Sequence, residues 1–184
     1  MLELNTDYYP PGAFYFGVYL IGAGALTYLL PTSVDASFQE VSGLEVKFDT
    51  EDVVEGGENR FVHHLPRPAR YSNLVLKRGV VTTDSLLGEW VGLTIGSTLS
   101  LPIVTQNLLV VLYSESGLPS IAWGVVNAYP LRWQTDTLSS LDNKVLTETL
   151  EFSYNYFERF TFGSGLSAVA TAAKLAQVAA RYAT

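Results

Sequence analysis

The segment from Phe38 to Pro66 constrains the fold more than any other part of the chain, because it has the pattern of a long β-hairpin. Apolar and charged residues alternate strictly in its first arm, from Leu44 to Asp49. This period of two predicts a half-buried strand with one apolar and one charged face. Upstream, the apolar residues fall out of phase at Ser42-Gly43, where a residue without a Cβ predicts a β-bulge.

The connection between the two arms is expected from Thr50 to Glu58, and the return arm from about Asn59 to Leu65. The connection is too long and too charged for a tight hairpin turn. It carries Val53-Val54 and Gly56-Gly57 among acidic residues. Exposed loops of this composition are often contact sites, so we weigh a partner-binding loop against an ordinary solvated turn.

Opposite charges are segregated along this part of the sequence. Eight acidic residues and one basic residue lie between Asp35 and Glu58, whereas Arg60 to Arg78 contains basic residues and no acidic one. If folding separates the two runs, an acidic surface of one copy meets a basic surface of the next and head-to-tail assembly follows. If folding brings them together, the surface is simply mixed. The residues that we predict to make contacts between copies are Glu45, Asp49, Glu51, Asp52, Val53, Val54, Glu55, Glu58, Arg60, Arg67, Arg70, Lys77 and Arg78.

The composition agrees with a protein that associates with itself. Hydrophobic residues make up 48% of the chain and charged residues only 16%, which is low for a soluble domain and indicates surface that is buried on assembly. The net charge of −7 argues against binding nucleic acid by phosphate neutralisation. The absence of cysteine fits the reducing cytoplasm. We expect no secretory signal at the N-terminus, and the apolar run from Val18 to Leu30 is too short to span a membrane.

The remaining patterns predict several strands and one short helix. Both faces of the first strand, expected at Ala13–Leu20, are apolar, so both are expected to be covered. Pro66 and Pro68 are expected to interrupt strand pairing. Strands are expected at Ala13–Leu20, Ser72–Arg78, Gln106–Tyr113, Ile121–Tyr129 with an extension at Trp133–Asp136 after an edge or bend at Pro130, and Leu146–Tyr156. A helix is expected at Ser85–Val91 after cap candidates at Thr82–Asp84. Without a βαβ rhythm, these elements predict a mainly β fold, an antiparallel β-sandwich or barrel with one short flanking α-helix.

The composition changes after Phe160. Gly163-Ser164-Gly165 predicts a hinge, and Leu166–Thr184 is rich in alanine and has a strong helix propensity. We therefore divide the chain into a β domain, residues 1–160, and a C-terminal helical extension, residues 161–184. We expect the extension either to pack on the outside of the assembly, to fray, or to act as an adaptor for a partner.

The sequence shows no pattern of catalysis or cofactor binding. His63 and His64 are adjacent on a strand and point to opposite faces, so they cannot easily share a metal ion. Neither a G-x-S-x-G elbow nor a glycine-rich phosphate loop occurs. We expect no enzymatic activity, no cofactor and no metal.

Five motifs follow one another along the chain. They are YYPPGAFYFGV at Tyr8–Val18, FQEVSGLEVKFDTEDVVEGGENRFVHHLP at Phe38–Pro66, YSNLVLKRGVVTTDSLLGEW at Tyr71–Trp90, AWGVVNAYPLRW at Ala122–Trp133 and LTETLEFSYNYFERF at Leu146–Phe160. In order and spacing they resemble the tail-tube (inner tube) proteins of contractile phage tails and phage-tail-like injection systems. The resemblance covers about residues 8–160.

The resemblance implies a structural subunit whose inner sheet joins those of neighbouring copies into a β-barrel ring. Hexameric rings then stack into a tube, the loop Thr50–Glu58 locks the rings together, and polar side chains line a lumen for cargo protein or DNA. The implied partners are further copies of the chain, a sheath protein outside the tube, and baseplate and terminator or cap proteins at its ends, without a membrane. The subunit is then cytoplasmic during assembly and later part of a tail-like particle.

Two other classes of protein remain open from the residues alone. A monomeric β-barrel that binds an apolar ligand explains the many aromatic residues without assembly. A hydrolase with an unrecognised carboxylate site is the other alternative.

Overall fold

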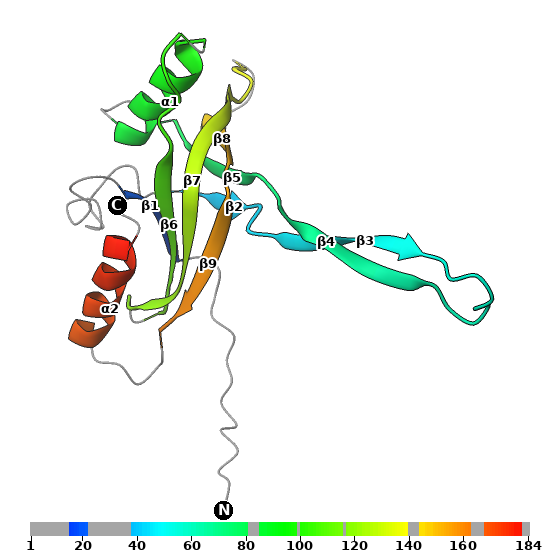
Figure 1. Ribbon diagram of the computed structural model, residues 1–184. Helices are drawn as coiled ribbons and strands as arrows, with labels where there is room; N and C mark the ends of the chain where they lie inside the picture. Colours follow the sequence, from blue (N-terminus) through cyan, green and yellow to red (C-terminus); the bar gives the residue numbers. More distant parts are fainter. Residues whose placement is uncertain are drawn as a thin grey trace, which may run out of the picture.

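The computed structural model describes residues 15–21, 38–80, 85–98, 100–115, 117–139, 144–162 and 168–181. Its elements are β1 (Phe16–Ile21), β2 (Glu40–Ser42), β3 (Val46–Val53), β4 (His63–Tyr71), β5 (Leu74–Gly79), α1 (Leu86–Gly96), β6 (Gln106–Tyr113), β7 (Pro119–Thr135), β8 (Thr147–Ser153), β9 (Tyr156–Thr161) and α2 (Ala168–Arg181) (Figure 1). Every strand pair is antiparallel. The predicted mainly β antiparallel fold with a flanking helix is confirmed.

Strand β7 organises the main sheet, whose order is β1-β6-β7-β8-β5-β2 with β9 also paired to β7. The first half of β7, Ile121–Val126, lies between β6 and β9, and its second half, Tyr129–Thr135, pairs with β8. Asn127 lies between the halves with a positive φ of 54°, a conformation that asparagine tolerates better than most residues. The sheet therefore changes direction there, and its two halves face each other as a sandwich.

The first hydrophobic core fills the space between the two halves. Val18 of β1 and Val110 of β6 meet Leu76 of β5 and Leu150 of β8 in one buried cluster. Helix α1 adds Trp90, whose ring stacks on that of Phe152 with the centroids 5.6 Å apart. The predicted buried strand at Gln106–Tyr113 is thus confirmed as β6.

Helix α1 begins one residue later and ends five residues later than the predicted Ser85–Val91. Ser85 is the N-cap, and its Oγ accepts a hydrogen bond from the Gly88 N–H at 2.9 Å. The cap candidates Thr82–Asp84 lie outside the described residues. The helix continues past Gly92 because a glycine inside a helix costs only about 1 kcal/mol and the packed face with Trp90 and Val91 holds the helix on the core.

A second hydrophobic core lies on the other face of the first half of the sheet. It consists of Tyr19, Ile21, Leu109, Val111, Ala122, Phe162 and Val178. Val178 belongs to α2, which lies along this side of the sandwich (Figure 1). Strand β1 sends Val18 into the first core and Tyr19 into the second, so the prediction that both of its faces are covered is confirmed.

Strands β3 and β4 form a separate two-stranded sheet that projects from the sandwich (Figure 1). The predicted hairpin is present, but its strands are longer than predicted. Strand β3 continues to Val53, and β4 runs through Pro66 and Pro68. These prolines do not interrupt pairing because β4 has a free edge and its register shifts opposite Phe48–Thr50, and proline is tolerated at edges and bulges.

The predicted strand Leu146–Tyr156 is divided in two. Strand β8 ends at Ser153, the Asn155 N–H donates to the Val126 oxygen at 3.0 Å, and β9 begins at Tyr156. The division follows the bend of β7, because β8 pairs with the second half of β7 and β9 with the first.

Gly43 marks the point where the chain leaves the main sheet for the hairpin. Its φ is +86°, and a Cβ at this position would lie 1.8 Å from the Asn73 oxygen. The Tyr154 hydroxyl donates to the Gly43 oxygen at 3.0 Å. The sequence predicted a bulge here, whereas the structure shows a junction between β2, paired with β5, and β3, paired with β4.

We expect Gly43→Ala to destabilise the protein by about 2 kcal/mol or more, because a strained positive φ is combined with a clash against backbone. The measurement is the denaturant midpoint of the unassembled chain. Gly79→Ala is the matched control, since its Cβ would meet nothing within 4 Å. Equal midpoints for the two variants would contradict this account of the junction.

Candidate assembly surface

The projecting hairpin presents apolar side chains to solvent. Val46 and Phe48 share one face of β3, and they are 46% and 65% exposed. Their cross-strand neighbours are Tyr71 and Ala69 of β4. The prediction that this arm is half-buried is therefore wrong for the single chain, since the hairpin extends away from the core that was expected to cover it.

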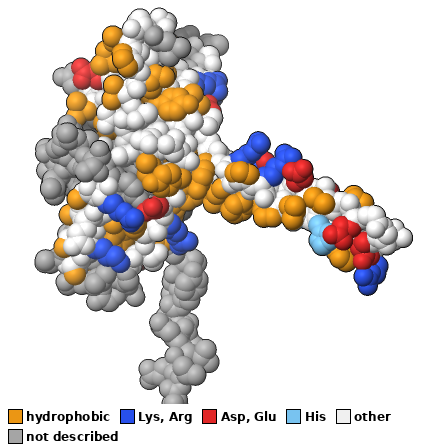
Figure 2. Space-filling view, in the orientation of Figure 1, with side chains coloured by type: hydrophobic (Ala, Val, Ile, Leu, Met, Phe, Trp, Pro, Cys, Tyr) orange, Lys and Arg blue, Asp and Glu red, His pale blue; other side chains and the backbone are white. Residues whose placement is uncertain are grey.

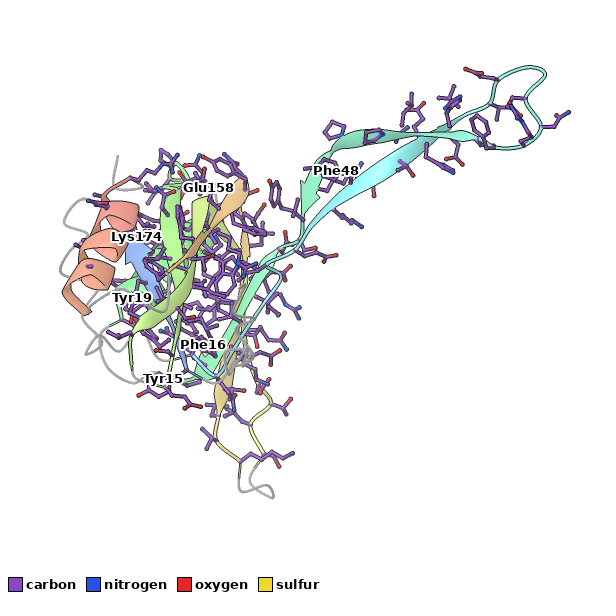
Figure 3. All side chains as sticks on the ribbon, turned by 90° about the horizontal axis from the view of Figure 1, so that it is seen from below. Tyr15, Phe16, Tyr19, Phe48, Glu158 and Lys174 are labelled. Atoms are coloured by element: carbon purple, nitrogen blue, oxygen red, sulfur yellow. The ribbon has the colours of Figure 1, made fainter. Side chains whose placement is uncertain are left out.

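The two sides of the hairpin differ in chemistry (Figure 2). Hydrophobic side chains follow one side, and basic and acidic side chains gather on the other near the sandwich. Phe48 projects from the hairpin at a distance from the packed interior of the sandwich (Figure 3). A β-ribbon that exposes several large apolar side chains to water has the surface pattern of a protein-binding arm.

The charges that are segregated in the sequence meet each other within the hairpin. The Arg70 Nε lies 3.0 Å from Asp49 Oδ2. The Arg67 Nη2 lies 3.2 Å from Glu51 Oε2. Antiparallel pairing brings an acidic strand against a basic one, so the surface is mixed, and the premise that the two runs form separate surfaces is wrong.

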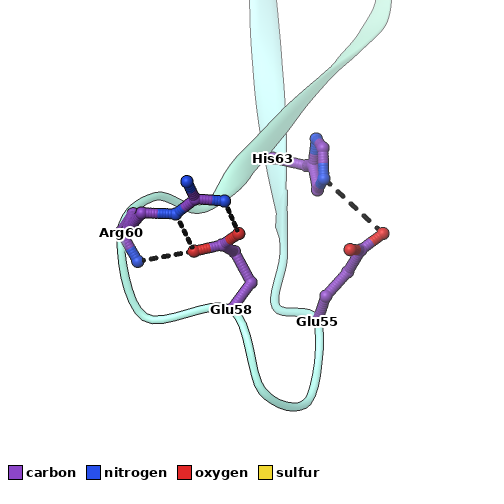
Figure 4. A network of polar contacts seen from close by, with 4 residues as sticks. All are labelled: Glu55, Glu58, Arg60 and His63. Atoms are coloured by element: carbon purple, nitrogen blue, oxygen red, sulfur yellow. Dashed lines mark hydrogen bonds and ion pairs between the residues drawn. The ribbon is translucent and has the colours of Figure 1, made fainter.

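The tip of the hairpin is a loop over residues 54–62, later than the predicted Thr50–Glu58. A bidentate contact between Arg60 and Glu58 holds it, with Nε–Oε1 2.9 Å and Nη2–Oε2 2.7 Å (Figure 4). The Arg60 guanidinium lowers the pKa of the Glu58 carboxyl. The loop exposes Val54 at 75% and Phe61 at 52%.

The two histidines lie at the distal end of the β3–β4 ladder and point to different partners. His63 Nε2 lies 3.5 Å from Glu55 Oε1 (Figure 4). His64 Nδ1 lies 2.6 Å from Asp52 Oδ1. Within the described ranges of the chain, no group of three or more histidine or acidic side chains is arranged to hold a metal ion.

The base of the hairpin is tied to the sandwich by polar contacts. The Ser72 hydroxyl donates to Glu45 Oε2 at 2.8 Å. Burial, with smaller contributions from Tyr71 and Glu45, raises the pKa of Tyr154 to about 12. The phenol therefore stays protonated through neutral pH and keeps donating to Gly43.

Arg78 lies inside the domain and is not a contact residue. Its side chain is 2% exposed, and its Nε donates to Glu148 Oε1 at 2.6 Å. The Trp133 Nε1 donates to the other oxygen of Glu148 at 2.9 Å, and Arg78 Nη2 reaches the helix cap Ser85 at 3.1 Å. The ion pair with Arg78 also explains why Glu148 is the one charged residue on the apolar side of β8.

Comparison with known proteins agrees with this geometry. Residues 12–158 match the family described as T4-like virus tail tube protein gp19. The chain belongs to this tail tube family.

Solved structures of similar proteins share the fold. A chain in the anti-feeding prophage baseplate is 29% identical with a TM-score of 0.67, and the match covers 86% of this chain and 99% of that one. A chain in the sheath–tube complex of the PVC extracellular contractile injection system is 19% identical with a TM-score of 0.67, covering 85% and 95%. A chain in the anti-feeding prophage tube-terminating cap is 20% identical with a TM-score of 0.68, covering 88% and 100%. Among curated proteins, none matches the sequence.

The family defines this tail tube protein as a structural component of a phage-like tail, not an enzyme. Helix α2 follows the matched segment, which ends at residue 158. Among the described helices, none is long and apolar enough to cross a membrane.

The predicted site residues did not include the exposed aromatic and leucine side chains of the hairpin. Phe48, Phe61 and Leu65 are all more than half exposed, yet the predicted contact residues were mainly charged. Leu65 pairs with Glu51, on the face of the hairpin opposite Phe48, and Phe61 lies in the tip loop. Alternation in the sequence shows only which residues of one strand share a face. It does not tell whether an apolar face is covered by its own chain or by another one.

We expect Arg78→Met to destabilise the tail tube protein by about 3–5 kcal/mol, because it leaves the buried Glu148 carboxylate without its cation. The double variant Arg78→Met/Glu148→Leu should recover much of the loss, since both charges are then removed. Denaturant titration of the unassembled chain measures both. Equal losses in the single and double variants would contradict a buried ion pair at this position.

Proposed function

We propose that this tail tube protein forms hexameric rings that stack into the inner tube of a contractile phage tail or phage-tail-like injection particle. The observation that carries the proposal is the exposed apolar side of the hairpin, on a chain that belongs to the tail tube family. Similar proteins occur in a baseplate, a sheath–tube complex and a tube-terminating cap. We therefore propose that a sheath protein surrounds the tube of this chain and that baseplate and cap proteins bind the ends of the tube.

Free strand edges supply the means of closing a ring. In the second half of the sheet, the described strands run in the order β7-β8-β5-β2, with β2 at one side and Tyr129–Thr135 of β7 at the other. Unpaired edges of this kind pair readily with another chain. The β2 edge of one subunit can pair with the β7 edge of the next subunit. When this contact is repeated around a closed ring, no subunit keeps a free edge.

The hairpin then contacts a neighbouring subunit or ring. Its apolar side supplies the buried area, and the loop over residues 54–62 reaches furthest from the sandwich (Figure 1). The contact residues of this proposal are Glu45, Asp49, Glu51, Asp52, Val53, Val54, Glu55, Glu58, Arg60, Arg67 and Arg70, to which we add Val46, Phe48, Phe61 and Leu65. Lys77 lies on the main sheet instead.

The location of the subunit and the use of the lumen follow from the proposed tube. The subunit is cytoplasmic until it assembles, and the lumen conducts cargo protein or DNA.

The apolar-ligand barrel has no support in the described core, because side chains from both halves of the sheet and from α1 fill the space between them. Helix α2 is held by Lys174 and Arg181 to β9, which favours a fixed outer layer over a free adaptor.

We expect Phe48→Ser to abolish tube formation while changing the free energy of unfolding by less than about 0.5 kcal/mol, because Phe48 is exposed in the single chain. Negative-stain electron microscopy and mass in solution measure assembly, and denaturant titration measures stability. Lys47→Ser, on the opposite face of the same strand, is the control that should still assemble. A normal yield of tubes from the Phe48 variant would contradict an apolar contact between subunits through this side chain.

We also expect tubes of the natural protein to persist at high salt. The hairpin charges are paired within the chain, so the contact between subunits is mainly apolar and salt does not screen it. Tubes that dissolve as salt rises would instead favour acidic-to-basic contacts between subunits.

A further inference from the structure

The two outer faces of the sandwich have opposite character. In β5 and β8, Leu76 and Leu150 point into the first core, so their chain neighbours point away from it. The residues on this outward face, here called the polar sheet face, include Glu40, Lys77, Thr149, Glu151, Arg132 and Gln134, together with Val75, which pairs with Glu151. Except for Val75 they are charged or polar, and they come from β2, β5, β8 and the second half of β7.

The charges of the polar sheet face are balanced in pairs. Glu40 of β2 is the cross-strand partner of Lys77 in β5. Glu151 of β8 is the cross-strand partner of Arg132 in β7. Opposite charges at directly paired positions favour the sheet, and they leave this face without an excess of either sign.

The opposite side of the sandwich is apolar and covered. The second core lies there, and Val178 of α2 is 7% exposed within it. Lys174 Nζ donates to the Thr161 oxygen at 3.1 Å and lies over the Phe162 ring, 5.6 Å from its centroid. Arg181 Nη1 lies 3.4 Å from Glu158 Oε2. Figure 3 labels Lys174 on α2 and Glu158 on β9, both on the sandwich and not on the hairpin.

We infer that the polar sheet face lines the lumen of the tube with a charge-balanced wall, and that α2 forms an added outer layer of the wall. This inference rests on the proposed function. The half of the sheet that carries the polar sheet face is also the half with the free β2 and β7 edges, so joining those edges makes one continuous polar surface. A helix packed on the other side then lies outside the ring and leaves the lumen open.

A wall of this kind fits cargo that carries both signs of charge, a polypeptide rather than a polyanion. Retaining a nucleic acid requires basic side chains that neutralise phosphates. On the polar sheet face, Lys77 and Arg132 are each matched by a carboxylate at the paired position. The uncharged Thr149 and Gln134 offer hydrogen bonds without a preferred sign of charge.

The orientation is tested with single cysteines, because the natural chain contains none. Thr149→Cys places a thiol on the polar sheet face, and Gln177→Cys places one on the exposed side of α2. Tubes confirmed by electron microscopy are treated with a small maleimide or with a large polyethylene glycol maleimide. We expect the large reagent to label Cys at 177 in tubes and to lose access at 149, while unassembled subunits react at both positions. Labelling of the Thr149 variant in tubes by the large reagent would overturn the inference, whereas absence of tubes would overturn the proposed function.

The charge of the wall is tested with single-stranded DNA as the probe. Glu40→Gln/Thr149→Lys adds positive charge to the polar sheet face, and Glu89→Gln/Gln177→Lys adds the same charge on α1 and α2. Tubes are assembled with the oligonucleotide at low salt, treated with nuclease and sedimented. We expect natural tubes to retain no protected DNA, the first variant to retain it, and the control to lose it to nuclease. Protected DNA in natural tubes at the level of the first variant would refute the charge-balanced wall.

Discussion

The bend of strand β7 is the constraint on which the rest of the structure depends. Because its two halves pair with different strands, one sheet folds back on itself and encloses the first core. The first half of this sheet is apolar on both faces, so it needs a second cover, and α2 supplies one. The second half is apolar on one face only. The difference between the two halves thus gives the subunit an inside and an outside.

The buried ion pair of Arg78 and Glu148 connects this framework to α1. It joins β5 to β8, and through Trp133 and Ser85 it reaches β7 and the helix cap. A buried pair contributes little net stability compared with apolar side chains of the same size, but it penalises alternative arrangements that would separate the charges. We regard it as the contact that fixes the position of the helix relative to the sheet.

Much of the fold was predictable from the sequence, because period-two alternation reports directly which side chains share a face. The hairpin followed from this alternation, whereas the buried strand β6 followed from a continuous apolar run bounded by turn signals and the helical tail from its alanine-rich composition. The errors arose where a distant partner decides the outcome. Arg78 reads as a surface cation until Glu148, seventy positions away, is brought beside it. Phe48 reads as a core residue because no local pattern shows that the hairpin leaves the sandwich. Leu146–Tyr156 reads as one strand because the bend of β7 is invisible in its own residues.

The internal pairing of the hairpin charges has a consequence for the kinetics of assembly. An arm whose arginines are paired with its own carboxylates gives little long-range attraction, so encounters between subunits are not steered. The chain as a whole carries a net charge of −7, and like-charged subunits repel one another within about one Debye length, ~8 Å at physiological ionic strength. Free subunits are thereby kept apart at a distance while the apolar contact remains strong once formed. Such subunits are expected to associate more slowly at low ionic strength, where this repulsion reaches further.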